Sequence, residues 1–559
     1  MNEHNGHPSP AHTSFDEFWQ YYLREHSSGL NRALHLTGTA AALVLAGTAL
    51  VRRKPRLLLL APLVGYAPAW FGHFVVERNR PASFHSPLWS LRADLRMLRL
   101  AVTGRLNDAL PRDDAAPGQA ASPEGAASAA RPIPRDPLPD STLALLMDPY
   151  RLVMRQCRKL GADLFETRLL LQRTICMTGP EASRLFHDTS RFMRKGAAPL
   201  RLQATLFGRG GVQMLDDAAH RHRKRMFLSM MTPESIQRLV DIAADVWRAQ
   251  ARRAAPEDVA LYEQAQEILT RAVCTWAGVP LGEDEVQKRT RTLTALFDGA
   301  GALGPRHWAS LLSRQEANAW IAGVVARIRD GSLGVPEGSP VHLVATYRDV
   351  DGNLLSPKIA AVEILNVLRP TVAVSVYLTF VAHALHHHPA SRQRIAAGDD
   401  VYLDRFVQEV RRFYPFFPSI VARTRHAFEW QGYRFPAGAR VMLDLYGTNH
   451  DPRAWSDPDR FDPDRFLREQ VDAFNLVPQG GGDHHVTHRC PGEWIAIELM
   501  KATARLLTGE LRYEVPPQDL EIDYTRLPAL PRSHFVMRNV GLRAEATGRV
   551  ATAEAGLSG

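Results

Sequence analysis

Residues Phe474–Leu507, FNLVPQGGGDHHVTHRCPGEWIAIELMKATARLL, place a glycine-rich loop directly before a long helical pattern. The loop delivers Cys490 to the start of that helix. At such a position the helix dipole and nearby backbone N–H groups stabilise a thiolate, which is the form of cysteine that binds a metal. A cysteine in a loop is usually inert, so the assignment of Cys490 as a metal ligand depends on the residues that accompany it.

Two more motifs precede this loop in the chain. Glu409 and Arg412, in the segment QEVRRF, have ExxR spacing and share one face of a predicted helix, and DPDRFDPDRFL supplies Arg465 in the second of two PxRF copies. Together with Cys490, these motifs resemble the cytochrome P-450 superfamily of haem-thiolate enzymes. The resemblance implies that Cys490 is the axial ligand of haem b. It also implies a structural ion network behind the haem, made of Glu409, Arg412 and Arg465.

The segment EILNVLRPTVAVSVYLTFVAHAL, which begins at Glu363, is where the distal helix of such a fold is expected. It has Arg369 and the helix-breaking Pro370 inside an otherwise apolar run. Most superfamily members have an acid and an alcohol there, which deliver protons to bound dioxygen. A buried guanidinium keeps its proton and requires an anionic partner. That partner is either an internal Asp or Glu or the carboxylate of a substrate.

Longer segments favour the substrate. RFMRKGAAPLRLQATLFGRGGVQMLDDAAHRHRKRMFLSMMTPE, LYGTNHDPRAW and PQGGGDHHVTHRCPGE resemble signatures of the fatty acid peroxygenase branch of the superfamily, and this resemblance covers about residues 142 to 545. It implies that Arg369 clamps the carboxylate of a long-chain fatty acid over the haem, and that this carboxylate carries the proton needed to split the O–O bond of hydrogen peroxide. Because peroxide arrives already reduced, no dedicated reductase is expected.

The same resemblance assigns roles to four residues near the start of this region. Arg194 and His220 hydrogen-bond the haem propionates, Phe207 borders the acyl channel, and Gln213 faces the distal pocket. Branch members that favour decarboxylation to terminal alkenes tend to have histidine in place of Gln213, so the glutamine favours hydroxylation. From the residues alone, His220 is also compatible with a surface position and Gln213 with a packed polar side chain. His488 is a departure, because the superfamily usually has arginine there.

Composition argues against several other functions. The formal charge of +9 over 559 residues is modest, and the arginines are scattered rather than gathered into a stripe with aromatic side chains, so nucleic-acid binding is not expected. The four cysteines show no CxxC spacing, which is typical of proteins in a reducing compartment. No dinucleotide fingerprint and no Walker loop occur in the sequence.

Composition also divides the chain. Residues 107–141 are rich in Ala, Pro, Ser and Gly, so they cannot bury enough surface to offset the entropy of ordering, and we predict a flexible linker. We predict disordered ends at 1–13 and 546–559, an N-terminal domain at 14–106 and a haem-thiolate domain at 142–545. The expected fold class is mainly α: a large cytochrome P-450-type fold with small β-sheets, preceded by a small all-α, membrane-associated helical hairpin.

The N-terminal domain contains two apolar runs, LTGTAAALVLAGTALV and LLLLAPLVGYAPAWFGHFVV. Each is near or below the roughly 20 residues needed to span a bilayer, and both contain Gly or Pro. The loop between them and the segment after them are both basic, so the positive-inside rule gives no crossing topology. We therefore expect a hairpin that is embedded in the membrane or lies on it, with the haem domain on the cytoplasmic side.

Histidines accompany these apolar runs. His73 and Glu77 are four residues apart and share a predicted helical face, and His26 and His35 complete a set of ligands such as non-haem Fe(II) uses. The segment from about residue 15 to 104 resembles the membrane-associated family that contains 2-hydroxy fatty acid dioxygenases, which use Fe(II) to shorten a 2-hydroxy acid by one carbon. Periodicity alone is equally compatible with histidines at a membrane interface.

The two resemblances imply consecutive reactions. A haem domain that hydroxylates a fatty acid at the α carbon makes the 2-hydroxy acid that the N-terminal domain is expected to shorten, and a tether raises the local concentration of one site near the other. The sequence therefore predicts a bifunctional fusion for fatty acid α-oxidation. The alternatives are a β-hydroxylating or decarboxylating peroxygenase with an N-terminal anchor, a non-catalytic haem or fatty acid sensor, and a monooxygenase that needs a reductase.

Overall fold

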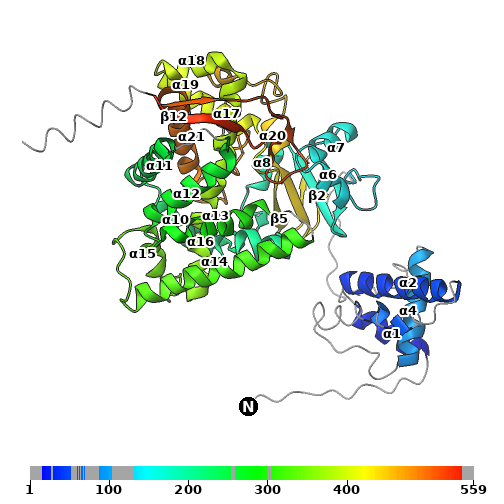
Figure 1. The fold of residues 1–559 in the computed structure, drawn as a ribbon. Helices are drawn as coiled ribbons and strands as arrows, with labels where there is room; N and C mark the ends of the chain where they lie inside the picture. The colour runs from blue at the N-terminus through cyan, green and yellow to red at the C-terminus, as the bar shows by residue number, and fades with distance from the viewer. Residues whose placement is uncertain are drawn as a thin grey trace, which may run out of the picture. The chain divides into compact units, whose positions relative to one another are not determined.

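The structure is a computed structural model, and it describes residues 15–26, 29–51, 59–60, 62, 64–66, 68, 87–103, 131–253, 258–299, 301 and 304–543. The chain forms two compact units, Met1–Ala127 and Ser128–Gly559, called the N-terminal unit and the C-terminal unit below (Figure 1).

Three helices form the described core of the N-terminal unit: α1 (Phe15–Glu25), α2 (Gly29–Val51) and α4 (Pro87–Val102). Both α1 and α2 pack against α4. The apolar side chains of α1 recur at helical spacing and so form one buried face. The buried apolar side chains of this unit's core are Phe18, Trp19, Tyr22, Leu23, Ala93 and Met97. Among the described residues of this unit no strand occurs, in agreement with the predicted all-α domain.

Part of α2 presents apolar side chains to solvent. Leu43 is 49% exposed, Val44 is 69% exposed and Val51, at the end of the helix, is 85% exposed. A contiguous exposed apolar surface usually marks a contact with a membrane or another protein. The second apolar run of the predicted hairpin lies largely outside the described residues, so membrane association stays a prediction.

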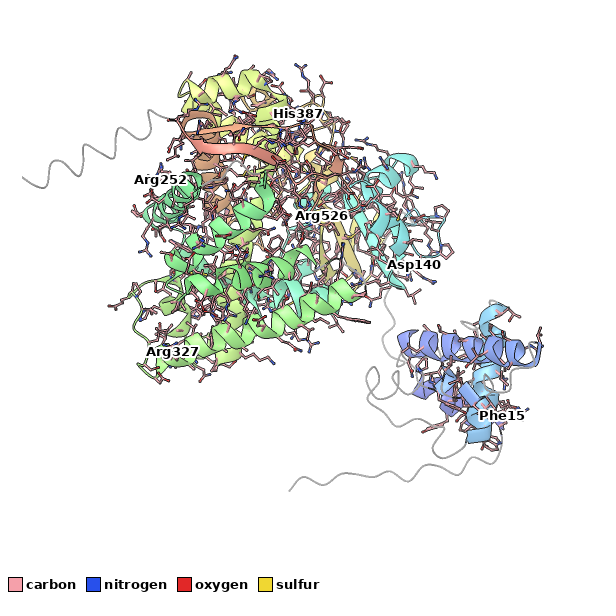
Figure 2. The ribbon with its side chains drawn as sticks, in the orientation of Figure 1. Phe15, Asp140, Arg252, Arg327, His387 and Arg526 are labelled. Atoms are coloured by element: carbon pink, nitrogen blue, oxygen red, sulfur yellow. The ribbon has the colours of Figure 1, made fainter. Side chains whose placement is uncertain are left out.

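The C-terminal unit is mainly helical, as predicted, and side chains fill the space between its helices (Figure 2). Its α-helices are α6 (Thr142–Met147), α7 (Leu152–Leu160), α8 (Pro180–Phe186), α9 (Leu200–Leu202), α10 (Asp217–Ser229), α11 (Pro233–Arg253), α12 (Leu261–Ala277), α13 (Val286–Asp298), α14 (Pro305–Arg329), α15 (Pro340–Ala345), α16 (Pro357–Ala373), α17 (Ser375–His387), α18 (Pro389–Ala396), α19 (Asp400–Phe413), α20 (Leu445–Asn449) and α21 (Glu493–Arg505). Short 3₁₀- or π-helices are η3 (Gln203–Phe207), η4 (Val212–Met214), η5 (Glu283–Glu285), η6 (Pro463–Leu467) and η7 (Leu506–Glu510).

Small sheets flank these helices. The strands are β1 (Leu164–Leu169), β2 (Gln172–Thr178), β3 (Phe192–Met193), β4 (Val259–Ala260), β5 (Ser419–Thr424), β6 (Phe428–Trp430), β7 (Tyr433–Phe435), β8 (Arg440–Asp444), β9 (Leu511–Glu514), β10 (Ile522–Asp523), β11 (Leu530–Pro531) and β12 (Val536–Leu542). The largest sheet has the order β1-β2-β8-β5-β3, in which only β2 and β8 run parallel. The other sheets are β4-β12-β9 and the pairs β10-β11 and β6-β7.

The segment 131–141, which composition assigns to the end of the linker, lies along β1. The backbone N–H of Asp136 donates to the carbonyl oxygen of Glu166 at 2.9 Å, and the N–H of Glu166 donates to the carbonyl oxygen of Pro134 at 2.7 Å. Ser141 continues this pairing, because its N–H donates to the carbonyl oxygen of Arg168 at 2.8 Å. These residues therefore belong to the C-terminal unit. Their apolar content is too low for the composition to show it.

Helices α16 and α17 form the centre of the C-terminal unit. Ser356 caps α16 by accepting a hydrogen bond from the backbone N–H of Ile359 at 3.3 Å, and Pro357 occupies the first turn. Pro370 lies inside α16 and lacks the N–H that would bond the carbonyl oxygen of Asn366. The two helices read as one apolar stretch of 31 residues, long enough to cross a membrane, but its most apolar window is 89% buried within the unit. It is therefore a core helix of this fold.

The ExxR and PxRF motifs meet behind this core. Both carboxylate oxygens of Glu409 accept from Arg412, at 2.7 and 2.9 Å, and one of them also accepts from Nε of Arg465 at 3.1 Å. All three side chains are essentially inaccessible to solvent. The remaining N–H groups of Arg412 bond backbone carbonyl oxygens, such as that of Asn449 at 2.9 Å. A buried carboxylate thus compensates two buried guanidinium groups and ties α19 to the loop that contains η6.

We predict that Glu409→Gln lowers the free energy of unfolding by about 3–5 kcal/mol, because it leaves the buried guanidinium of Arg412 without an anion, while Arg465 keeps its ion pair with Glu469. Urea denaturation followed by circular dichroism measures this change. The matched control is Glu283→Gln, which removes an exposed carboxylate that pairs with Arg271 on the surface. No measurable change is expected for the control, and equal effects of the two variants would contradict the prediction.

Candidate active site

Cys490 lies in the loop between a glycine-rich turn and α21. Gly480 and Gly482 adopt φ values of 87° and 79°, which other residue types rarely adopt. The backbone N–H of Cys490 donates to the carbonyl oxygen of Gln479 at 3.0 Å. Desolvation raises the pKa of the Cys490 thiol, although the backbone N–H of Gly492 acts in the opposite direction. A thiolate at this position therefore needs a cation beside it, and the iron of a haem meets that need.

Lys224 of α10, which no sequence motif singled out, holds this loop. Its buried Nζ donates to the carbonyl oxygen of Thr487 and, at 2.7 Å, to that of Arg489. Desolvation lowers the pKa of Lys224 to about 8, while the negative charge of Cys490 raises it. The Thr487–His488 and Arg489–Cys490 peptide groups are thus fixed directly before the cysteine, which restricts the position of its sulfur atom.

Arg369 projects from α16 and is only 7% exposed. Its Nη2 donates to Oδ1 of Asn366 at a long 3.4 Å, and its Nε has no hydrogen-bond partner. Desolvation lowers the pKa of Arg369 and the charge of Arg314 lowers it further, whereas the thiolate of Cys490 raises it. In the part of the chain that the structure describes, no carboxylate forms an ion pair with Arg369, so the internal salt bridge considered from the sequence is absent there.

The acidic residue of the distal helix is already paired. Glu363, which is fully buried, accepts from Nη1 of Arg223 at 2.5 Å and from Nδ2 of Asn366 at 3.0 Å. The same Nδ2 lies 3.2 Å from Oε1 of Gln213, so Gln213 contacts the distal helix. Glu363 is therefore held by another arginine and does not neutralise Arg369. Arg223 and Asn366 lie within the signature segment and the distal-helix segment, but the sequence assigned no role to either residue.

Phe207 is the last residue of η3, which lies beside α14. Its partly buried ring packs against the main core, and Gly208 follows with a φ of 79°. A Cβ atom at Gly208 would lie 2.7 Å from Cγ1 of Val362 in α16, so this turn sits directly on the distal helix. Phe207 thus directly precedes the turn that contacts α16, and its place beside an acyl channel stays a prediction.

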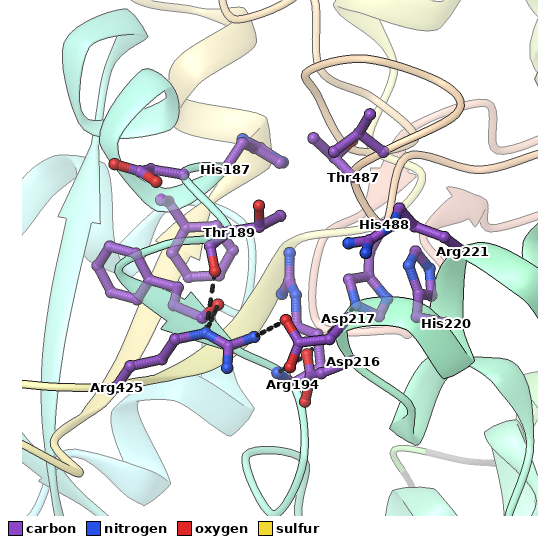
Figure 3. A pocket seen from close by; sticks show the side chains of 14 residues that line it. His187, Thr189, Arg194, Asp216, Asp217, His220, Arg221, Arg425, Thr487 and His488 are labelled. Atoms are coloured by element: carbon purple, nitrogen blue, oxygen red, sulfur yellow. Dashed lines mark hydrogen bonds and ion pairs between the residues drawn. The ribbon is translucent and has the colours of Figure 1, made fainter.

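Arg194 and His220 line one pocket together with His488 and Asp216 (Figure 3). The rings of His220 and His488 stack with centroids 3.8 Å apart, and Asp216 accepts from the backbone N–H of Arg194 at 2.8 Å. Desolvation lowers the pKa of His220 to about 2 and that of His488 to about 4, so both rings are neutral near pH 7. One guanidinium and two imidazole groups suit the two propionates of a haem. The unexpected histidine of the ligand loop thus lies in the same pocket as Arg194 and His220, and propionate binding there stays a prediction.

In the N-terminal unit, His26 and His35 point their Nε2 atoms at each other across 3.1 Å. Nδ1 of His26 lies 2.6 Å from the carbonyl oxygen of Tyr22, and Nδ1 of His35 lies 2.7 Å from Oδ1 of Asp94. Acceptors at Nδ1 leave the lone pair on Nε2, and histidines that bind metals are usually oriented in this way. The two Nε2 atoms lie within hydrogen-bond distance of each other, and this pair is the part of the predicted Fe(II) site that the structure describes.

The rest of the predicted Fe(II) site cannot be placed in the same way. His73 and Glu77 lie outside the described residues, and within the described ranges no group of three or more His, Cys, Asp or Glu side chains is arranged to hold a metal ion. Asp94, which the sequence reasoning missed, contacts the imidazole of His35 from the opposite side of the ring. The signal that could have found it is its spacing within the amphipathic helix α4.

Two family models match the chain. Residues 12–106 match "2-hydroxy-palmitic acid dioxygenase Mpo1-like", and residues 400–537 match "Cytochrome P450". Among curated relatives, vinorine hydroxylase of Rauvolfia serpentina is 34% identical over 24% of this chain and 29% of its own length. The chain spans less than a third of that relative. A putative cytochrome P450 135B1 of Mycobacterium tuberculosis is 26% identical over 54% of this chain and 68% of its own length.

Solved structures match over a longer region. Cytochrome P450SP alpha (CYP152B1) in complex with (R)-ibuprophen is 52% identical, with a TM-score of 0.71 over 72% of this chain and 99% of that one. Cytochrome P450EX alpha (CYP152N1) with myristic acid is 43% identical, with a TM-score of 0.72 over 74% and 100%. Ligand-free cytochrome P450 OleT is 32% identical, with a TM-score of 0.71 over 74% and 99%. The chain therefore belongs to the cytochrome P-450 family, with an Mpo1-like domain fused on its N-terminal side.

Proposed function

We propose that the C-terminal unit hydroxylates long-chain fatty acids at the α carbon with hydrogen peroxide, and that the N-terminal unit shortens the resulting 2-hydroxy acid by one carbon with Fe(II). The observation that carries this proposal is the guanidinium of Arg369, which is buried on the distal helix without a carboxylate partner in the described part of the chain. The proposed sequence of reactions is fatty acid α-oxidation.

The substrate supplies the missing anion. Nε of Arg369 has no partner, and its Nη2 has only the long contact with Asn366. Two N–H donors therefore remain available for a paired hydrogen bond to a carboxylate. The structure of cytochrome P450EX alpha with myristic acid supports a fatty acid as the ligand. Its carboxylate would neutralise Arg369 and its apolar chain would lie against Phe207.

The bound carboxylate also performs the acid–base step. A cysteine-ligated haem, when bound, supplies the centre that transfers an oxygen atom of peroxide to a C–H bond. Arg369 fixes the acid, and the carboxylate accepts a proton from one peroxide oxygen and returns it to the other. Glu363 does not perform this role because Arg223 holds it. Asn366 and Gln213 keep the distal helix and the η4 turn in register.

The position of oxidation follows from the two units together. A headgroup held at Arg369 brings the carbons next to the carboxylate nearest to the reactive centre, which restricts reaction to the α or β position. The Mpo1-like match favours the α position, because a 2-hydroxy acid is the substrate that its family description names. A β-hydroxylating or decarboxylating enzyme with an N-terminal anchor is the alternative.

The N-terminal unit is proposed to bind Fe(II) through His26 and His35, with His73 and Glu77 as further ligands. The facing Nε2 atoms and the Asp94 carboxylate behind His35 support this site. The exposed apolar side chains of α2 support attachment to the cytoplasmic face of a membrane, where long-chain acids concentrate. No reductase and no nucleic acid are expected as partners.

We predict that Arg369→Gln lowers kcat/KM for a long-chain acid with peroxide by at least about 100-fold, because two charge-assisted hydrogen bonds to the carboxylate are lost. The reduced carbon monoxide spectrum serves as the control, since an intact thiolate-bound haem shows that the variant is folded. Turnover at the wild-type rate by a variant with that spectrum would contradict the role of Arg369.

We predict that the whole chain converts a long-chain acid and peroxide into the 2-hydroxy acid, and then, with Fe(II) and dioxygen, into an acid one carbon shorter. Mass spectrometry of the products measures both steps. A 3-hydroxy acid or a terminal alkene as the main product would support the alternative enzyme instead. Chelation of the non-haem iron should stop the second step only.

We predict that His35→Ala removes the non-haem iron, and that Asp94→Asn weakens iron binding by roughly 10- to 100-fold because the imidazole loses its orienting carboxylate. Metal analysis of the purified protein, corrected for haem, measures both effects. His387→Ala, at the exposed end of α17, is the matched control and should retain the iron. Unchanged iron content in His35→Ala would contradict the proposed site.

A further inference from the structure

A second arginine is buried against the distal helix and has no role in the mechanism above. Arg314 of α14 is only 2% exposed. Its Nε donates to Oδ1 of Asn318 at 3.1 Å and its Nη1 donates to the carbonyl oxygen of Thr205 at 3.3 Å. Its Nη2 has no hydrogen-bond partner. A buried guanidinium edge that bonds nothing is costly unless a ligand completes it.

The glycine at 208 makes room for this guanidinium. A Cβ atom at Gly208 would lie 1.9 Å from Nη2 of Arg314 and 2.7 Å from Cγ1 of Val362, so the three residues meet at one point on α16. Val362 and Arg369 are seven residues apart and share one helical face, with a separation of roughly 10 Å along the axis. Helices α14 and α16 pack side by side, which brings Arg314 to that face (Figure 1).

The charges around this face do not balance. Among the described residues Arg223, Arg314 and Arg369 are all buried here, and only Arg223 forms an ion pair, which is with Glu363. Burial lowers the pKa of Arg369, and the charge of Arg314 lowers this pKa further, whereas Cys490 raises it. Elsewhere in the unit Arg411, Arg412 and Arg465 each form an ion pair with a buried carboxylate. The distal cluster is therefore built for two anions.

We propose that Arg314 is a second carboxylate-binding position, and that the preferred substrate class is a linear dicarboxylic acid whose two ends meet Arg369 and Arg314. This inference rests on the proposed function only in that Arg369 takes the carboxylate nearest to the haem. The same chemistry can also come from a separate molecule, when a second, short acid occupies Arg314 beside a monocarboxylic substrate. In both cases the ligand of Nη2 is a carboxylate oxygen.

A carboxylate-binding position at Arg314 makes the protein select dicarboxylic acids over their monomethyl esters. An apolar chain that passes Arg314 leaves Nη2 without a hydrogen bond, whereas a carboxylate forms a charge-assisted bond there. A dicarboxylic acid of matching length should therefore bind more tightly than its own monomethyl ester, which has the same chain but one charge fewer. The difference should be largest at one chain length, set by the separation of the two arginines.

The experiment uses the haem-loaded full chain and measures binding by the change in haem absorbance. Each member of a series of linear dicarboxylic acids is compared with its monomethyl ester and with the monocarboxylic acid of equal length, in the presence and absence of acetate. The variants are Arg314→Gln, which keeps a donor for Thr205 but removes the charge, and Arg314→Lys, which keeps the charge. The matched control is Arg289→Gln, because Arg289 is a similarly buried arginine that already pairs with Glu285.

In the wild type we expect the best dicarboxylic acid to bind roughly 10- to 100-fold more tightly than its ester. This ratio should fall to near one in Arg314→Gln, remain in Arg289→Gln and persist in part in Arg314→Lys. If acetate tightens binding of the monocarboxylic acid only when Arg314 is present, the carboxylate at Arg314 comes from a separate molecule. The proposal is overturned if the wild type shows neither tighter binding of the dicarboxylic acid than of its ester nor the effect of acetate. It is also overturned if the preference for the dicarboxylic acid remains in Arg314→Gln.

The outcome is independent of the test of the main function. Arg369→Gln should abolish binding of every acid in the series if the proposed function is right. Tight binding of monocarboxylic acids by Arg369→Gln would refute that function. The effect of Arg314 on the ratio of affinities for the dicarboxylic acid and its ester would still be measured with Arg369 intact.

Discussion

The distal side of this protein is governed by the cost of burying positive charge. Removing a guanidinium from water costs several kcal/mol, and this cost is recovered only when an anion with good geometry is nearby. At Arg369 the described part of the protein offers an amide oxygen at 3.4 Å and the more remote thiolate of Cys490. The site is therefore incomplete electrostatically, and an acid is the kind of molecule that completes it.

Behind the core of the same unit, buried guanidinium groups are neutralised by a carboxylate of the protein itself. Glu409 accepts hydrogen bonds from both Arg412 and Arg465, and backbone carbonyl oxygens take up most of the remaining donors. That network supports the scaffold by tying α19 to the loop that contains η6. Lys224 adds to this support by bonding two carbonyl groups next to Cys490. Buried cations thus stabilise the scaffold on one side and prepare a binding position on the other.

Motifs with fixed spacing made much of this predictable. The ExxR, PxRF and cysteine-loop residues are close in sequence or carried by regular elements, so the mainly α fold and the position of Cys490 followed from the sequence. Contacts between distant segments did not, because nothing in the chain order brings Arg223 to Glu363 or Asp94 to His35. The segment 131–141 was missed for another reason: it bonds β1 through its backbone, which composition does not report.

The ion pair between Arg223 and Glu363 also bears on how the protein tolerates its oxidant. A peroxide-driven haem protein with its own mobile carboxylate would consume peroxide continuously and oxidise itself. Here the resident acid is immobilised, so under the proposed function the chemistry cannot begin until a fatty acid brings its own. Under the proposed function, the pair would make the use of peroxide depend on the presence of the fatty acid.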